Sequence, residues 1–266
     1  MRRRTFIPIF TGVVALGSTG SLWAITGGPK DFVCPLCKTK NKFWVWFSWG
    51  SYIYHFPSRF QLVFWPYTDT KFLFHCKKCR LTAFSDDFQK PPQDKLAATR
   101  DVLRDVKIVY DTGDYETTPM FERLEVAEKV YGIWGLKDSE WCHFYRVKGY
   151  HLQGEKQQAG ADSARQRALD LALKLYADPD QVGERKESLT IMAAMRHYLR
   201  DDKQALQDLR AASELTYTNP KLKEEQSKNY DGYLSALIRD YVDALENGKS
   251  TDEKEEKEPP KVGSAP

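Results

Sequence analysis

The sequence has few of the residue combinations from which most active sites are built. Five histidines are spread over 266 residues, and no Ser/His/Asp constellation, paired-carboxylate signature or glycine-rich phosphate loop stands out. The formal net charge of +3 is too small to indicate a polycation that binds nucleic acid or membranes. These absences predict that the protein is not an enzyme.

A long hydrophobic run is also missing from the N-terminus. Three arginines precede residues 5–29, which carry no charge, but Pro8 and three glycines interrupt the apolar part, and a membrane-spanning helix needs about 20 predominantly apolar residues. A basic start followed by a weakly apolar stretch predicts an export signal over residues 1–24, with cleavage near Ala24. The letters RRRTFI resemble twin-arginine signals, so the expected location is the periplasm or cell envelope. An uncleaved N-terminal membrane anchor is the alternative.

Four of the five cysteines form two CxxC motifs. Two such motifs provide the four thiolates that a tetrahedral zinc ion needs, and four thiolates leave no position for a catalytic water. The sequence therefore predicts one structural Zn²⁺ bound by Cys34, Cys37, Cys76 and Cys79. The competing hypothesis is a thiol-redox protein that uses the CxxC pairs, which export to an oxidising compartment would favour. Cys142 is most simply a buried apolar residue.

The 38 residues between the two motifs are rich in aromatic side chains. Lys42–Phe47 and Lys71–Phe74 are predicted to be strands, and each lies next to a CxxC motif. Residues 43–67 carry more rings than a small ribbon can enclose, so we expect this segment to join the ribbon to the rest of the protein and to leave a minority of rings exposed. Between Cys34 and Lys90 there are nine Lys or Arg against three Asp. A basic and aromatic ribbon that binds nucleic acid is therefore a further alternative, although export argues against it.

After Pro91-Pro92 the hydrophobic period changes from two to about 3.6 residues, which is typical of helices. Thr118-Pro119 and Asn219-Pro220 are expected to be pairs of N-cap and first helical residue. The predicted helices are Gln93–Val106, Pro119–Trp134, Ser139–Gly154, Asp162–Ala177, Lys186–Leu199, Asp202–Leu215 and Asn229–Leu245.

Two of these helices carry the spacing of small and bulky residues found on the second helix of tetratricopeptide repeats. The two arrays are Ala164, Ala168, Leu171 and Ala205, Leu209, Ala212. They are 41 residues apart, whereas the usual repeat has about 34. The repeats are therefore expected to be irregular, and an ordinary antiparallel helical bundle is the alternative.

The predicted fold is α+β and mostly α, with a small zinc ribbon-like β module followed by a tetratricopeptide-like domain of helical hairpins. The boundaries are 32–90 for the module with its aromatic insert and 93–246 for the helices, followed by a disordered tail at 247–266 that is charged and proline-rich. Stacked helix pairs form extended surfaces that suit a protein or peptide. We therefore expect a non-catalytic, exported zinc-binding scaffold with a protein or peptide partner. Nucleic acid is not the expected partner, and membrane contact is expected only through an uncleaved N-terminus.

The chain resembles a bacterial family of uncharacterised proteins, domain of unknown function 2225, over about Phe32 to Leu215. The stretches that carry the resemblance are VCPLCKTKNKFW, FWPYTDTKFLFHCKKCRLTAFSDDF, FERLEVAEKVYGIWGLKDSEWCHFYRVKGYHL and RQRALDLALKLY. The resemblance implies two CxxC motifs that bind metal, followed by tetratricopeptide-like helices, and it implies no activity. Arg80-Leu81 stands where the family usually has Gly-Tyr, and an export signal is not a general feature of the family.

Overall fold

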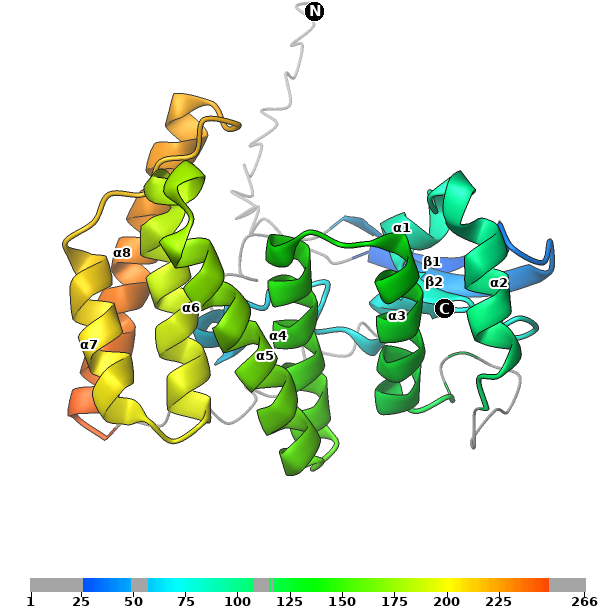
Figure 1. Ribbon diagram of the computed structural model, residues 1–266, viewed down its shortest axis with the longest axis horizontal. Helices are drawn as coiled ribbons and strands as arrows, with labels where there is room; N and C mark the ends of the chain where they lie inside the picture. Colours follow the sequence, from blue (N-terminus) through cyan, green and yellow to red (C-terminus); the bar gives the residue numbers. More distant parts are fainter. Residues whose placement is uncertain (1–25, 49–56, 108–114, 116, 249–266) are drawn as a thin grey trace, which may run out of the picture.

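The computed structural model describes residues 26–48, 57–107, 115 and 117–248 (Figure 1). The predicted export signal, the middle of the aromatic insert and nearly all of the predicted tail lie outside these residues. A small region of antiparallel strands precedes a body of helices, which confirms the predicted α+β, mostly α class. Within the described part of the chain, no helix is both long enough and apolar enough to cross a membrane.

The elements follow one another in this order. The strands are β1 (Thr26–Val33), β2 (Lys40–Ser48), β3 (Leu73–His75) and β4 (Thr82–Phe84). The α-helices are α1 (Ser85–Gln89), α2 (Leu96–Arg104), α3 (Met120–Trp134), α4 (Asp138–Gly154), α5 (Gln158–Ala177), α6 (Arg185–Tyr198), α7 (Asp202–Ser213) and α8 (Glu224–Glu246). Short 3-10 helices are η2 (Pro57–Gln61), η3 (Thr70–Phe72), η4 (Gln93–Lys95) and η5 (Pro179–Glu184).

The strands form two antiparallel hairpins, and each hairpin has a CxxC motif at its turn. β1 pairs with β2, and β3 pairs with β4. Strands β2 and β3 correspond to the two that the sequence predicts, although Thr70–Phe72 forms η3 and so shortens β3. The sequence analysis misses β1, because its glycines and proline disfavour a strand, and it misses β4, which has only three residues.

All seven predicted helices are present, but neither predicted capping pair caps a helix as expected, and α5 and α8 begin at Gln158 and Glu224, before their predicted starts at Asp162 and Asn229. Pro119 is itself the N-cap of α3, one position later than expected. The first N–H groups of this helix are bound by the residue that follows α4, since the Glu155 carboxylate accepts from Met120 N (3.0 Å) and Phe121 N (3.1 Å). Asn219 lies before the start of α8, and its Oδ1 accepts from Lys221 N (2.9 Å), so it closes a turn instead of capping a helix.

Helices α4 to α8 pack in sequence, each against the next, while α3 lies toward the strands (Figure 1). The alanines that the repeat spacing singles out in α5 and α7 are buried at these contacts, among them Ala168 and Ala205 at 0% exposure. Helices α4 and α5 approach closely at Gly149, where an added Cβ would lie 3.0 Å from Arg165 Cγ. The described helices therefore form antiparallel hairpins, and a relation to tetratricopeptide repeats stays a prediction.

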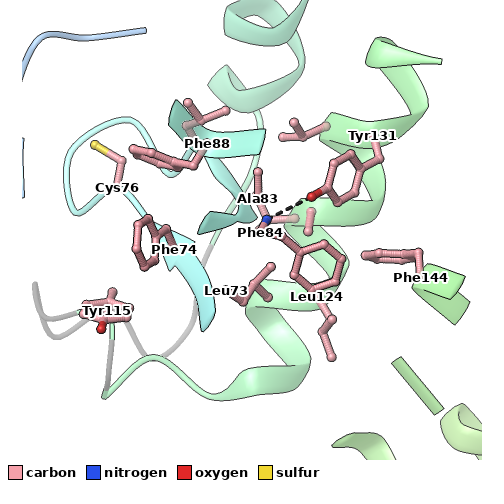
Figure 2. Close-up of a cluster of buried hydrophobic side chains, with 14 of the residues drawn as sticks. Leu73, Phe74, Cys76, Ala83, Phe84, Phe88, Tyr115, Leu124, Tyr131 and Phe144 are labelled. Atoms are coloured by element: carbon pink, nitrogen blue, oxygen red, sulfur yellow. Dashed lines mark hydrogen bonds between the residues drawn. The ribbon is translucent and has the colours of Figure 1, made fainter. Parts of the chain in front are cut away.

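Two clusters of buried apolar side chains hold these elements together. The first runs from the cysteine hairpins into α3 and α4, and Figure 2 shows its rings around the β3–β4 hairpin. At its centre Tyr131 Oη accepts from Phe84 N (2.9 Å) and donates to Asp87 (2.7 Å). The second cluster lies among α4 to α8 and includes Phe60 and Leu62 of the aromatic insert. The first cluster therefore joins residues on both sides of the boundary predicted near residue 91.

The described end of the insert, residues 57–67, lies across three helices, and we call it the strap. Its 3-10 helix η2 contacts α4, α6 and α8. Phe60 is only 4% exposed, and its ring centroid lies 4.5 Å from that of Tyr241 in α8. Beside it, Arg59 forms an ion pair with Asp240 (3.1 Å). The strap therefore packs on the helices, as expected for the aromatic segment.

Buried cationic and imidazole groups of the helices bind the strap through its backbone and through Gln61. Arg146 of α4 donates to the carbonyl oxygens of Leu62 (2.6 Å) and Gln61 (3.3 Å). Arg165 of α5, with no exposed surface, donates to Gln61 Oε1 (3.2 Å). Burial lowers the pKa of His151 to about 4, so at neutral pH its uncharged ring donates from Nε2 to the Tyr67 carbonyl (2.8 Å). Because a buried polar group without a partner is costly, the strap supplies acceptors that the helices need.

Truncating Phe60 should therefore cost far more stability than truncating an exposed ring nearby in sequence. Phe60→Ala removes a buried ring and should lower the free energy of unfolding by about 3–5 kcal/mol. Phe47, at 62% exposure, is the matched control, and Phe47→Ala should change the free energy by no more than about 0.5 kcal/mol. Urea unfolding of the metal-loaded proteins measures both. Equal destabilisation by the two substitutions would contradict the packing of the strap.

Candidate metal centre

The two CxxC motifs fold into the same hydrogen-bonded turn. In each motif the N–H of the first cysteine donates to the carbonyl of the fifth residue after it, and its own carbonyl accepts from the N–H of the fourth. The bonds are Cys34 N to Thr39 O (2.9 Å), Lys38 N to Cys34 O (2.9 Å), Cys76 N to Leu81 O (2.8 Å) and Arg80 N to Cys76 O (2.8 Å). The repeated turn directs both thiols of a motif to the same side, which is the geometry that a shared ion needs.

The residue after each second cysteine adopts a left-handed backbone, with φ of 61° at Lys38 and 65° at Arg80. Glycine is the residue that occupies this conformation at least cost. Arg80 takes it where the resembled family usually has glycine, and its guanidinium donates to the carbonyl of Val106, after α2. The arginine therefore links the second turn to α2 by a bond that glycine could not make.

The four thiols of the two motifs converge in one cluster. Their sulfur atoms all lie within 4.8 Å of one another. The separations are 3.5 Å between Cys34 and Cys79 and 3.6 Å between Cys37 and Cys76. Both of these short separations join different motifs, so the site needs both hairpins. The cluster is positioned to hold a metal ion.

The other candidate side chains lie apart from this cluster. Cys142 is buried in α4 with its Sγ 3.5 Å from the Ala168 carbonyl, as expected for an apolar residue. His75, the neighbour of Cys76, directs Nδ1 to Thr82 Oγ1 (2.7 Å). In the part of the chain that the structure describes, the four cysteines are the one group of His, Cys, Asp or Glu whose ligand atoms converge in this way.

Hydrogen bonds within the cluster shift the pKa values of Cys34, Cys76 and Cys79 in different directions. Hydrogen bonds from Cys34 and Cys79 hold the pKa of Cys76 well below its usual range. The hydrogen bond to Cys76 in turn raises the pKa of Cys34 to about 12, and bonds to Cys34 and Cys76 raise the pKa of Cys79. Four adjacent thiolates would repel one another, so the cluster without an ion keeps some of its thiols protonated. A divalent cation between the sulfurs offsets part of that repulsion and favours the thiolate forms. Metal binding at this site therefore releases protons and weakens as the pH falls.

Asn41 is a functional residue that the sequence analysis missed. It is 4% exposed, and its Nδ2 lies 3.6 Å from Cys76 Sγ and 3.0 Å from the Thr39 carbonyl. Its Oδ1 accepts from Lys77 N (3.1 Å), so one amide joins the two turns. Groups that bond to metal ligands orient them and tune the ion. The sequence does contain a signal for this role. In a strand whose side chains alternate between two faces, Asn41 is a polar residue at a position that should point inward, between Lys40 and Lys42.

Substitution of one cysteine of the cluster should remove the metal, whereas substitution of the fifth cysteine should not. Cys76→Ser replaces a central thiolate, so it should lose most of the metal and loosen the hairpins. Cys142→Ser, in α4, should keep one metal ion per chain. Elemental analysis of the purified proteins measures the content. Equal metal in wild type and Cys76→Ser would contradict the site.

Comparison with known proteins adds no relative to this description. No family model, curated protein or solved structure matches the chain. Membership of the resembled family therefore stays a prediction. The geometry of the site alone indicates that the two CxxC motifs can bind a metal ion.

Proposed function

We propose that the protein is a non-catalytic, exported scaffold whose single Zn²⁺ is structural. The observation that carries the proposal is the closed cluster of four sulfurs, with separations of 3.5 and 3.6 Å across the two motifs. Zinc–sulfur bonds of about 2.3 Å in a tetrahedron place the sulfurs about 3.8 Å apart, close to these values. Four thiolates complete the coordination of the ion, so no position is left for substrate or water.

The role proposed for the ion is to fasten the strap to the helices. The first motif precedes β2 and the second follows β3, so an ion that binds both closes a loop of 38 residues. That loop contains the strap, which packs on α4, α6 and α8. Closing a loop removes conformational freedom from the unfolded chain and so stabilises the folded one. The ion thereby supports helices that supply none of its ligands.

The partner is proposed to be a protein or peptide that binds the helices. Since the strap already occupies one side of α4, α6 and α8, the surface proposed for the partner is formed by α5 and α7. Leu173 of α5 is 39% exposed there, and it is one of few large apolar side chains at the surface of the described residues. Exposed apolar residues of this kind supply the anchors of protein interfaces.

The thiol-redox alternative makes a different prediction about the cysteines. A CxxC redox pair forms its disulfide within one motif, whereas the sulfur separations of 3.5 and 3.6 Å here join different motifs. Protein isolated from the cell envelope should therefore show five thiols after denaturation with a chelator, together with one zinc per chain. One thiol and no metal would establish the redox alternative, and iron in place of zinc would contradict the identity of the ion.

Capture of a partner should depend on the surface of α5. Leu173→Glu places a charge in the proposed interface and should reduce recovery of a specific envelope protein by tenfold or more, on the order of 1.4 kcal/mol. Val182→Glu, at a residue that is 55% exposed in η5, is the matched control and should leave recovery unchanged. Co-purification with quantitative mass spectrometry measures both. Equal recovery of the partner with the two variants would show that it binds elsewhere on the protein.

A further inference from the structure

The four cysteines of the metal centre divide into two pairs by their exposure to solvent. Cys34 and Cys76, the first cysteines of the two motifs, have 0% exposed surface, and we call them the inner cysteines. Cys37 and Cys79, the second cysteines, are partly exposed, and we call them the outer cysteines. A reagent in solution therefore meets the cluster first at an outer cysteine.

Hydrogen bonds further reduce the reactivity of one inner cysteine. Asn41 Nδ2 lies 3.6 Å from Cys76 Sγ, and the backbone N–H groups of Lys78 and Cys79 also donate to this sulfur. Donors that stabilise a thiolate lower its nucleophilicity. Cys76 is therefore protected from a reagent both by its burial and by its hydrogen bonds.

Each outer sulfur lies close to an inner sulfur of the other motif. Cys37 Sγ is 3.6 Å from Cys76 Sγ, and Cys79 Sγ is 3.5 Å from Cys34 Sγ. Since the sulfurs of a disulfide are about 2.05 Å apart, each of these pairs needs to approach by only about 1.5 Å to form one. Both pairs cross from one hairpin to the other, so a disulfide at either would join the hairpins.

We propose that the outer cysteines are a modification site for hydroperoxides, and that their oxidation ends in the two disulfides Cys34–Cys79 and Cys37–Cys76. The proposal rests on the metal centre of the proposed function, in which all four sulfurs are thiolates. The product keeps the loop of 38 residues closed after the ion has left. Disulfides within each motif, the product of a CxxC redox pair, would leave the two hairpins unlinked.

At Cys37 and Cys76 the reaction has two steps. The Cys37 thiolate attacks one oxygen of hydrogen peroxide, so an S–O bond forms, the O–O bond breaks, and the hydroxide that leaves takes a proton from solvent to become water. The Cys76 thiolate then attacks the sulfur of the sulfenic acid, so an S–S bond forms and the S–O bond breaks. The second hydroxide is likewise protonated to water. One peroxide is thus reduced by two electrons for each disulfide, and the ion is released as its ligands are oxidised.

Peptide mapping of the oxidised chain tests which cysteines pair. Trypsin leaves Cys34 and Cys37 together on the peptide Asp31–Lys38, but it cuts between Cys76 and Cys79. After treatment with hydrogen peroxide and digestion without reduction, most of Asp31–Lys38 should be recovered linked to both of the other peptides. Fragmentation between Cys34 and Cys37 then assigns each disulfide.

The mapping uses the zinc-loaded full chain with Cys142→Ser, and the wild type is treated in parallel. Cys142 is buried in α4 and supplies no ligand, so its substitution removes the one thiol that could exchange with the new disulfides after digestion. The two proteins should give the same pairing. The positions of the disulfides also distinguish this modification from the thiol-redox alternative, which forms them within each motif.

Two further measurements test the order of attack and the consequence of the links. A substoichiometric amount of N-ethylmaleimide, added to the reduced, zinc-loaded chain, should label mainly Cys37 and Cys79. In urea, the oxidised chain without metal should have an unfolding equilibrium constant smaller by about 30-fold or more than that of the reduced chain without metal, because its loop is still closed.

Three results would overturn the proposal. They are any pairing other than Cys34–Cys79 and Cys37–Cys76, label found mainly on the inner cysteines, and an oxidised chain no more stable than the reduced chain without metal. Absence of zinc from the native protein would instead overturn the proposed function. In that case the same mapping, done on the metal-free chain, still decides between disulfides across the motifs and disulfides within them.

Discussion

The structure depends on bringing two short hairpins together although 38 residues separate their cysteines. Neither hairpin alone can complete a four-thiol site, and a two-stranded hairpin alone is marginally stable in water. Once the sulfurs lie within 4.8 Å of one another, the intervening chain must leave the first hairpin and return to the second. It makes that excursion over the helices, as the strap. The cysteine cluster and the helical packing are therefore two consequences of one closed loop.

Buried cations make the strap and the helices mutually dependent. Arg146 and Arg165 lie in the interior, and the backbone and Gln61 of the strap accept their hydrogen bonds. Leaving a buried charge without its partner typically costs about 3–5 kcal/mol, a large fraction of a typical domain's stability. The same contacts fill a side of the helices that a repeat protein would ordinarily leave open to a ligand. The composition of the sequence changes between the cysteine module and the helices. The packing of side chains, in contrast, is continuous across that boundary.

The sequence predicted what local patterns determine. Seven helices are predictable because each buries one stripe with a period near 3.6, and the cysteine site because two CxxC motifs are typical of structural zinc; α1, with five residues, is too short to show such a period. β1 was missed because a segment that starts Thr-Gly-Gly-Pro becomes a strand only through its pairing with β2. The prediction that Asn219 is a helix N-cap is wrong because an asparagine side chain can also accept a hydrogen bond within a local turn, as Asn219 does. No local pattern could place Phe60 against Tyr241, or Asn41 beside Cys76, since such contacts join segments far apart in the chain.

The two segments that meet in the contact between Phe60 and α8 are synthesised at different times. Arg59 and its partner Asp240 are 181 positions apart, so the strap leaves the ribosome long before the helix that covers it. At about 5–20 residues per second, the interval is roughly 10–40 s. During that time the rings of the strap have no α8 to cover them and are open to a chaperone or to another nascent chain. The last helix that the structure describes is therefore the one that completes the burial of the strap.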